Sequence, residues 1–447
     1  MQRIVFIIFF TFSLGFSQRV VGYYPYWMQN TFQPNDLDLE TFTHINHSFA
    51  WPDEEGQIVA PAGMLDPSIA DYIHINNRKI ILSLGGWGQA QTAGFVSSTS
   101  TSELRSEFIA NIIDKMIAYG YDGVDIDWEH PQSTEQKNNL SDFIEELDST
   151  LNQFDPELLI TMAVPISNWS GQWYDFSSLR PHVDFFNAMT YDIHGGWSSN
   201  AGHNSPLYQS PPGDPDGSIE TGINYLLNTR GVPESKVNMG IPFWGKKYNA
   251  SQINGSFNGS VTDMHYSEIL PLINNGWDYQ WDNNAKCPYL VKDDQSQIIT
   301  YDNPLSIQRK CEFAQDRNLG GVMVWALGYD DMNTSESLTA AIHANWLHIE
   351  NEKSILPTKI NLNAYPNPFN PQTTINFKLP VSNKIVLDIF DMNGKLVDNV
   401  LNGYFKKGHY SLVWDPLFNR NTLSSGIYIV FLSGKGMRAS NKILYVK

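Results

Sequence analysis

Four acidic residues fall within the first eight positions of one short stretch, DGVDIDWEHP, at residues 122–131. Three of them, Asp125, Asp127 and Glu129, alternate with apolar residues, so in a β-strand their side chains share one face. Burying like charges together costs several kcal/mol unless the chain gains something in return. A solvated edge strand is the alternative interpretation, but the β-branched and aromatic residues on the opposite face favour a covered strand. Clustered carboxyl groups of this kind suit general acid–base catalysis.

The strand that carries these acids belongs to a repeated pattern of short apolar runs between about residues 19 and 327. The runs are RVVGYYPYW, THINHSFAW, KIILSLGGW, DGVDIDWE, LLITMAVP, DFFNAMTYD, KVNMGIPFWG and GVMVWALG. An intervening segment, SELRSEFIANIIDKMIAYG, spaces its apolar residues by three and four and closes on Gly120, as a helix does. This alternation predicts an α/β fold, a (β/α)8 TIM barrel over residues 18–347. An open doubly wound sheet fits less well, because no glycine-rich phosphate loop follows the first run.

One connection between the predicted strands is far longer than a crossover helix needs. It lies between GIPFWG and GGVMVWALG and has an aromatic, strand-like sequence. We therefore expect a small α+β insertion at about residues 245–300, before strand eight, followed by the last barrel helix at about residues 304–318.

Aromatic residues gather where the predicted strands end, and chemistry in a TIM barrel is carried by the loops at those ends. Eight of the chain's 13 tryptophans lie there: Trp27, Trp51, Trp87, Trp128, Trp169, Trp197, Trp244 and Trp325. Flat aromatic side chains pack against the C–H faces of sugar rings, so the set indicates a carbohydrate cleft, although any one member can be an ordinary packing residue. The other acids at the strand ends are Asp192, Asp330 and Asp331. A retaining glycosidase usually places its two carboxylates on different strand ends, so this distribution leaves the nucleophile unassigned.

The stretch DGVDIDWE resembles the DxxDxDxE signature of family 18 glycoside hydrolases, the chitinases. The resemblance extends to SLGG at residues 83–86, to MTYD at residues 189–192 and to Trp325 in GVMVWALG, and it covers about residues 20–331. The insertion resembles, in a shorter form, the α+β wall of the deeper-clefted subfamily. This family is an exception to the two-carboxylate scheme, because the substrate assists its own cleavage.

The resemblance implies a substrate-assisted retaining mechanism. Glu129 protonates the glycosidic oxygen and later acts as base toward water, while the 2-acetamido oxygen of the sugar attacks its own anomeric carbon to form an oxazolinium ion. Asp127 holds the acetamido N–H, Asp125 takes up or shares a proton with Asp127, and Tyr191 donates to the acetamido oxygen. Asp122 is an odd number of residues from Asp125, so its side chain would not share the inward face of the other acids. We therefore expect it to be a structural hydrogen-bond anchor at the base of the strand.

The substrate contacts implied by the resemblance are Tyr23, Trp27, Phe49, Gly86, Trp87, His130, Met189, Asp192 and Trp325. His130 replaces the tyrosine that commonly follows the catalytic glutamate, and a lone histidine there is more often a structural hydrogen-bonder than a proton shuttle. The implied substrate is chitin or N-acetylglucosamine oligosaccharides, cleaved by a monomer without metal or cofactor. The alternatives are an endo-β-N-acetylglucosaminidase that acts on glycoprotein glycans, a lectin on the same barrel, and a hydrolase of another glycan such as peptidoglycan. Lectins of this kind usually lack the glutamate.

The N-terminal residues predict export. Arg3 precedes IVFIIFFTFSLGFS, an apolar segment too short to span a bilayer comfortably that ends in small residues, so residues 1–17 are expected to be a cleaved signal peptide. An uncleaved anchor is the alternative. The net charge of −18 argues against nucleic acid and against anionic membranes as partners. Cys287 and Cys311 are too few for a disulfide scaffold, and their spacing is not that of a zinc site. The sequence leaves two alternatives for them, one disulfide or two free thiols.

The sequence changes character after His348. A polar, proline-rich linker is expected at residues 348–361, and an all-β sandwich at residues 362–447, from the strands TTINFKLP, KIVLDIF, YSLVWD, GIYIVFL and KILYVK and the hairpin signature DMNGK. AYPNPFNPQTTINFKLP and SSGIYIVFLSGKGMRASNKILYVK resemble the C-terminal sorting domain of type IX secretion cargo. The resemblance implies contact with the secretion machinery and a secreted or cell-surface protein. A chitin-binding module is the alternative, but Trp414 is the only tryptophan of the tail.

Overall fold

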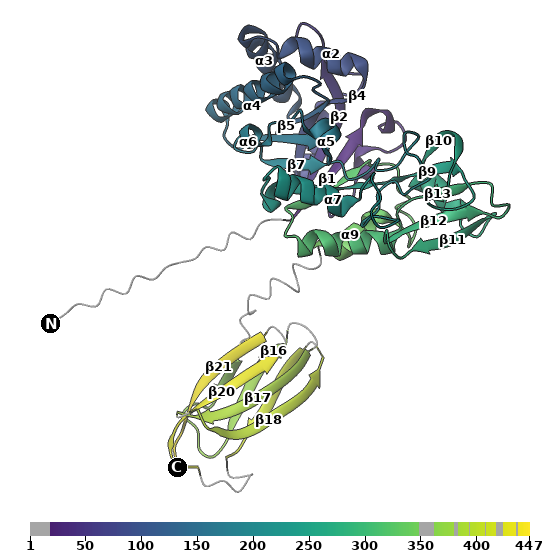
Figure 1. The fold of residues 1–447 in the computed structure, drawn as a ribbon. Coiled ribbons are helices and arrows are strands. Elements are labelled where there is room, and N and C mark those ends of the chain that lie inside the picture. The colour runs from purple at the N-terminus through teal and green to yellow at the C-terminus, as the bar shows by residue number, and fades with distance from the viewer. Residues whose placement is uncertain are drawn as a thin grey trace. The chain divides into compact units, whose positions relative to one another are not determined.

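The structure is a computed structural model, and it describes residues 18–347, 362–379, 383–392, 394–406, 408–416, 423–434 and 437–447. The chain divides into two compact units, one that ends at Leu347 and one that begins at His348 (Figure 1). The predicted signal peptide and linker lie outside the described residues. No helix of the described residues is both long and apolar enough to cross a bilayer.

The first unit is built on a closed parallel barrel. Its strands are β1 (Arg19–Pro25), β2 (His44–Pro52), β4 (Lys79–Trp87), β5 (Gly123–Glu129), β6 (Leu159–Val164), β7 (Phe185–Ala188), β8 (Val237–Pro242) and β14 (Gly321–Trp325). They pair in chain order, and β1 closes the barrel by pairing with both β2 and β14. The short strand β3 (Ile58–Val59) is added antiparallel to β2. The TIM barrel predicted from eight apolar runs is therefore confirmed.

Helices surround this barrel (Figure 1). The α-helices are α1 (Pro67–Ile75), α2 (Gln89–Ser98), α3 (Ser102–Tyr119), α4 (Thr134–Phe154), α5 (Asn168–Gly171), α6 (Phe176–Leu179), α7 (Ile219–Asn224), α9 (Pro304–Asp316) and α10 (Leu338–Ile342). Shorter turns of 3-10 or π type are η1 (Tyr26–Met28), η2 (Pro34–Asp36), η3 (Tyr225–Thr229), η4 (Glu234–Lys236) and η6 (His343–Leu347).

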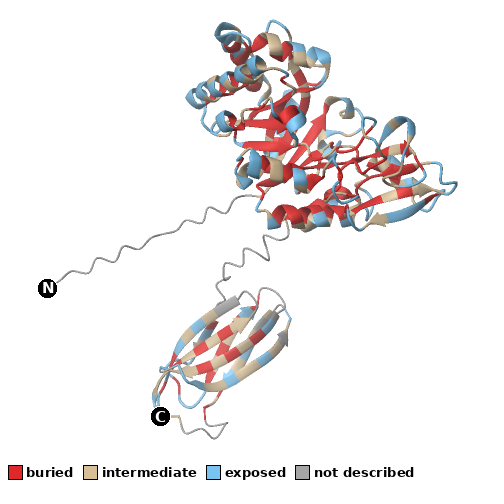
Figure 2. Cartoon of the chain, viewed as in Figure 1, coloured by how far each residue is buried: buried red, intermediate tan, exposed pale blue. Residues whose placement is uncertain are grey.

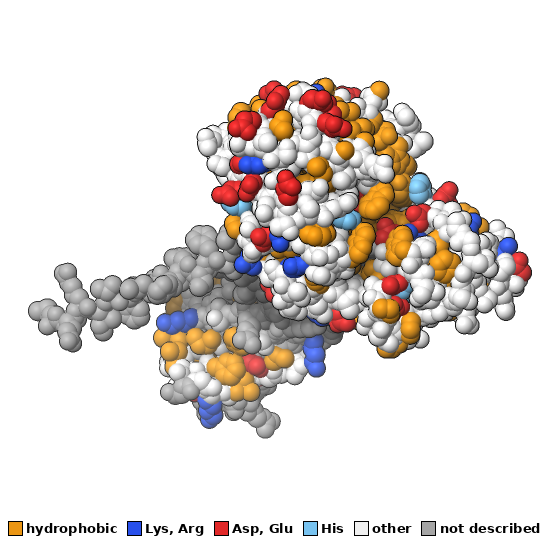
Figure 3. Space-filling model, turned by 45° about the horizontal axis from the view of Figure 1, so that its top comes forward, with side chains coloured by type: hydrophobic (Ala, Val, Ile, Leu, Met, Phe, Trp, Pro, Cys, Tyr) orange, Lys and Arg blue, Asp and Glu red, His pale blue; other side chains and the backbone are white. Residues whose placement is uncertain are grey.

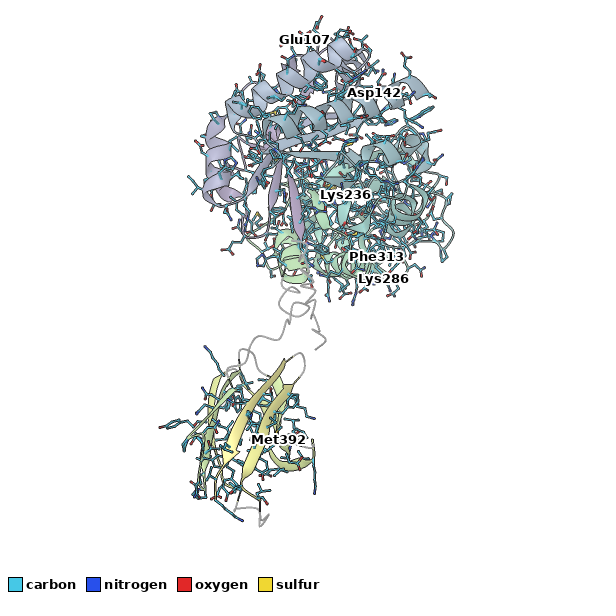
Figure 4. The ribbon with its side chains drawn as sticks, turned by 90° about the vertical axis from the view of Figure 1, so that its left-hand side faces the viewer. Glu107, Asp142, Lys236, Lys286, Phe313 and Met392 are labelled. Carbon is cyan, nitrogen blue, oxygen red and sulfur yellow. The ribbon has the colours of Figure 1, made fainter. Side chains whose placement is uncertain are left out.

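Helix α3 shows how the local sequence sets the ends of these helices. The Thr101 side chain accepts a hydrogen bond from the Leu104 N–H at its start, and Gly120 ends it in the left-handed conformation, as predicted. Glu107 on α3 and Asp142 on α4 are labelled in Figure 4. Helix α9 begins at Pro304, as expected, but α10 follows β14, so α9 is not the last helix of the barrel.

The barrel strands are buried on both faces (Figure 2). On β5, the apolar residues between the acids face the surrounding helices, and Trp128 stacks on Phe95 of α2 with ring centroids 5.3 Å apart. The acids of the same strand therefore point to the barrel interior. The side-chain parity predicted for this strand is confirmed.

The predicted α+β insertion is present before β14. It consists of β9 (Trp244–Asn249), β10 (Asn258–His265), α8 (Tyr266–Ile269), η5 (Leu270–Leu272), β11 (Trp277–Asp282), β12 (Cys287–Lys292) and β13 (Ile298–Thr300). The strands form one antiparallel sheet in the order β10-β9-β13-β12-β11. Cys287 on β12 and Cys311 on α9 are buried free thiols, which decides between the two alternatives left open by the sequence.

The second unit consists of two antiparallel sheets around a core of its own. One contains β15 (Leu362–Tyr365), β16 (Thr373–Leu379) and β19 (Gly408–Trp414); the other contains β17 (Asn383–Asp391), β18 (Leu396–Phe405), β20 (Gly426–Gly434) and β21 (Met437–Tyr445). β17 and β18 form the predicted hairpin. Trp414 is only 3% exposed and donates to Asp398, so it offers no open face to a polysaccharide.

Candidate active site

Asp125 lies at the centre of the barrel and is fully buried. Its carboxylate accepts hydrogen bonds from Tyr23 Oη at 2.8 Å, from Ser83 Oγ at 2.7 Å and from Thr161 Oγ1 at 2.5 Å. These donors stand on β1, β4 and β6, so strands from around the barrel converge on one carboxyl group. Burial raises the pKa of Asp125, and the hydrogen bonds act in the opposite direction.

Asp127 lies two residues after Asp125 on β5, closer to the mouth of the barrel, and is 4% exposed. Its Oδ1 atom is buried without a hydrogen-bond partner among the described residues. Burial raises the pKa of Asp127 well above its ordinary value, and the charges of Glu129 and Asp125 raise it further. All three effects act against the charged form of this carboxyl group.

Glu129 ends β5 and is partly exposed at the mouth. Burial, followed by the charge of Asp192, raises the pKa of Glu129 to about 7. A carboxyl group with this pKa can both donate and accept a proton near neutral pH. Of the four acids in the sequence motif, Glu129 is thus the best placed to act on a bound substrate.

Tyr191 follows β7 and packs edge-on against Trp244, with ring centroids 4.9 Å apart. Burial raises the pKa of Tyr191 well above its ordinary value, and so do the charges of Asp127, Glu129 and Asp192. The hydroxyl therefore stays protonated and can donate a hydrogen bond. Tyr191 and Trp325 both pack against the interior cluster that includes Tyr23, and the charge of Glu129 acts on the Tyr191 hydroxyl.

An aromatic group forms the floor beside these acids. Trp325, at the end of β14, stacks on Phe49 at 5.3 Å and meets Tyr23 edge-on at 5.6 Å. Trp27 meets Trp325 edge-on at 6.0 Å and is 41% exposed, which extends the aromatic surface outward. On the face of the first unit that Figure 3 shows, hydrophobic side chains gather between the barrel and the insertion.

A close approach of two backbones positions the acids relative to this floor. Gly85 lies opposite Asp127 in the register of β4 and β5, and a Cβ atom on Gly85 would lie 2.0 Å from the Asp127 carbonyl oxygen. A Cβ atom on Gly86 would lie 2.7 Å from the Phe49 ring. The two glycines of SLGG therefore leave the space that the acid strand and the aromatic floor occupy.

The rim carries several exposed or half-buried rings. Trp87 ends β4 and is 73% exposed, and its ring centroid lies 6.3 Å from that of His130. His130 meets Trp169 edge-on at 4.9 Å, and burial lowers the pKa of His130. The structure thus places His130 between two rim tryptophans; a structural hydrogen bond at this residue remains a prediction. Met189 directly follows β7 and is half-buried, and its contact with substrate is likewise a prediction.

Lys246 of the insertion links the rim to the acids. Its Nζ atom lies 2.7 Å from Asp192 and 2.9 Å from Asp263, and 5.4 Å from the centre of the Trp197 ring. Burial alone would lower the pKa of Lys246, but the two carboxylates raise it above its ordinary value. Lys246 therefore places a positive charge beside Asp192, the carboxylate whose charge raises the pKa of Glu129.

Some residues singled out by the sequence lie outside this arrangement. Trp128 is 1% exposed in the core, so its predicted place in a cleft-lining ring is wrong, because its parity on β5 is opposite to that of the acids. Asp330 accepts from the N–H groups of Leu338 and Thr339 and so caps α10. Asp122 accepts from the Ile80 N–H at 2.8 Å, which confirms it as a structural anchor.

Sequence analysis missed Thr161 and Asn187, which point to Asp125 or its partners from neighbouring strands, and Lys246. Thr161 and Asn187 could have been found as polar residues inside otherwise apolar runs. One possible metal-ligand group occurs among the described residues, His194, Asp214 and Asp216. Hydrogen bonds to His203 O and Asp214 Oδ2 occupy both ring nitrogens of His194, and the group shares no residue with the candidate active site.

Comparisons with known proteins identify the families of the barrel and of the tail. Residues 19–330 match the model of glycosyl hydrolases family 18, and residues 363–447 match that of the secretion system C-terminal sorting domain. A probable endochitinase of Caenorhabditis elegans is 31% identical over 337 residues, 68% of this chain and 54% of the relative. The chain spans between 15% and 58% of the length of the first curated relatives.

Two solved structures are informative. The Group IV chitinase of Ostrinia furnacalis in complex with allosamidin is 27% identical with a TM-score of 0.69, over 76% of this chain and all (100%) of that one. Human YKL-39, described as a pseudo-chitinase with retained chitooligosaccharide binding, is 25% identical with a TM-score of 0.67, over 74% of this chain and 99% of that one. The chain belongs to glycosyl hydrolase family 18, and its tail is a secretion sorting domain.

Proposed function

We propose that this protein is a chitinase that hydrolyses β-1,4-linked N-acetylglucosamine polymers with the help of the substrate's own acetamido group. The observation that carries the proposal is the pair at the end of β5. Burial and the charge of Asp192 raise the pKa of Glu129 to about 7, and beside it the buried Asp127 has an oxygen with no hydrogen-bond partner among the described residues. A proton donor next to an unused hydrogen-bonding group is what acetamido-assisted cleavage requires.

The roles follow from the environment of each group. Glu129 gives its proton to the glycosidic oxygen, and as carboxylate it later takes one from water. Asp127 binds the acetamido N–H and so turns its oxygen toward the anomeric carbon, while Tyr191 donates to that oxygen. Asp125 is held by three hydroxyl donors and fixes the strand on which the other two acids stand. Trp325 supports the sugar from below.

A non-catalytic lectin is the competing function, because a relative on the same fold is described as a pseudo-chitinase that still binds chitooligosaccharides. The presence of Glu129 with a pKa near neutrality favours catalysis. An endo-β-N-acetylglucosaminidase shares the acid motif; the α+β insertion and the MTYD segment favour chitin as the substrate. The sorting domain, together with the predicted signal peptide, supports secretion or display at the cell surface.

Product analysis tests the proposal directly. The full chain is incubated with N-acetylglucosamine oligomers and, separately, with a high-mannose glycoprotein, and NMR follows the anomeric configuration of the first products. We expect cleavage of the oligomers with retention. Fully deacetylated chitosan and cellulose should resist cleavage, because they lack the assisting group. Inversion, equal rates on cellulose, or release of glycans in place of chitin products would contradict the proposal.

A further inference from the structure

A second cavity lies in the insertion and shares no lining residue with the candidate active site. Its volume is about 740 Å³, and it is open to the surface. It is formed by α8, η5, the edge strand β11, the start of α9 and the loop before α10. The residues that matter for its chemistry are Tyr266, Asp278, Tyr279, Gln280, Tyr301 and Asn303.

The walls of this cavity combine aromatic rings with an unsatisfied hydroxyl. Tyr279 is 39% exposed on β11, whereas Tyr301 is 3% exposed and Tyr266 is 1% exposed. The hydroxyl of Tyr301 has no hydrogen-bond partner among the described residues. A buried hydroxyl without a partner is costly, and Tyr301 is one of the residues that line the cavity.

The polar residues that line the cavity are two carboxylates, Asp278 and Glu336, and three amides, Asn274, Gln280 and Asn303. Asp278 and Gln280 are exposed on β11, on either side of Tyr279. Asn303 Nδ2 donates to the Tyr279 hydroxyl at 3.4 Å, and Asn303 Oδ1 accepts from the Ser306 N–H at the start of α9. Several hydrogen-bonding groups around an accessible ring suit a polyhydroxylated ligand with apolar C–H faces, that is, a sugar.

Ring contacts lead from the rim of the candidate active site to the residue next to this cavity. Trp27 donates to the Tyr329 hydroxyl at 3.1 Å, and His265 stacks on Tyr329 with ring centroids 3.7 Å apart. The next residue, Tyr266, lines the cavity. The cavity and Trp27 therefore lie on the same unit and are linked through Tyr329 and the adjacent residues His265 and Tyr266.

We propose that this cavity is a second glycan-binding site, which holds N-acetylglucosamine units of a polymer outside the catalytic cleft. The identity of the sugar rests on the proposed function. Such a site increases the time that the enzyme spends on an insoluble chain and adds nothing to the cleavage of an oligomer too short to reach it.

The test compares Tyr279→Ala with the wild type in the full chain, using retention on insoluble chitin and kcat/KM on a soluble trimer of N-acetylglucosamine. We expect retention to weaken about threefold to tenfold, from the loss of one stacking ring, while kcat/KM on the trimer changes less than about twofold. Tyr279→Trp, which keeps a flat ring, should restore retention. Phe154→Ala removes an exposed aromatic residue of α4 and is the matched control.

The outcomes separate the two proposals. Equal retention by the wild type and Tyr279→Ala overturns the second site, as does a wild type that is not retained at all. A parallel loss of retention, trimer cleavage and melting temperature would assign Tyr279 a structural role and also overturn it. If Tyr279→Ala loses retention while the wild type releases no sugar from any chitin, the second site stands and the hydrolytic function fails.

Discussion

The carboxyl group of Glu129 is tuned by burial and by one neighbouring charge, that of Asp192. Replacing it with an amide in Glu129→Gln keeps the shape of the side chain and removes the transferable proton. We expect kcat to fall by about 10²- to 10⁴-fold on N-acetylglucosamine oligomers, with binding of the oligomer retained. Steady-state kinetics and calorimetric titration measure the two quantities. Activity within a few fold of the wild type would remove Glu129 from the role of proton donor.

The pH dependence of activity offers a second prediction at this residue. The donor must be protonated, so kcat/KM should decline as pH rises through about 7, the pKa of Glu129. Asp192→Asn removes a negative charge that raises this pKa, so the alkaline side of the profile should move to lower pH. Asp263→Asn is the matched control, because Asp263 also binds Lys246 but is not among the groups that shift Glu129. A profile unchanged in Asp192→Asn would show that burial alone sets this pKa.

Residue parity explains which parts of the site could be predicted from sequence. The alternation in DGVDIDWE places three acids on one face of a strand, and the structure agrees. The same alternation places Trp128 on the other face, so the aromatic residues at strand ends could not all line one cleft. Lys246 could not be predicted, because its contact with Asp192 joins the insertion to the β7 loop and depends on tertiary packing alone.

At the scale of elements, the backbones of strands β4 and β5 approach so closely at Gly85 that a side chain there would not fit. Gly85 has φ of +125° and faces the Asp127 carbonyl oxygen. We expect Gly85→Ala to lower the free energy of unfolding of the barrel by about 2–4 kcal/mol, from backbone strain together with the clash. Gly63 also has positive φ, +80°, but nothing lies within 4 Å of a Cβ there, so Gly63→Ala should cost only about 1 kcal/mol. Equal losses in denaturant titrations of the two variants would contradict the close approach.

The elements of the barrel were predictable because each strand is a distinct apolar run between helices. The tail was less so: five of its strands were recognised, and β15 and β18 were missed. β15 has four residues and leads directly into a proline, and β18, LVDNVLNGYF, interrupts its alternation with polar and glycine residues. Neither segment has the regular alternation of apolar and polar residues from which a strand is predicted.

At the scale of the whole molecule, the two units have separate hydrophobic cores. A chain that stops after Leu347 should therefore fold, with kcat/KM on a soluble oligomer within about twofold of the full chain. In the producing cell it should fail to reach the exterior, because the residues that match the sorting domain are removed. Calorimetry, kinetics and cell fractionation check the three expectations, and export of the truncated chain would contradict the role given to the tail.

Both sulfhydryl groups of this protein are buried and form no disulfide. Cys287 donates to the Ser205 carbonyl oxygen, and burial raises the pKa of each thiol to about 12, so the nucleophilic thiolate is scarce at neutral pH. Dithiothreitol should accordingly leave the melting temperature unchanged. Because neither cysteine pairs, folding of the barrel requires no thiol oxidase and no disulfide isomerase.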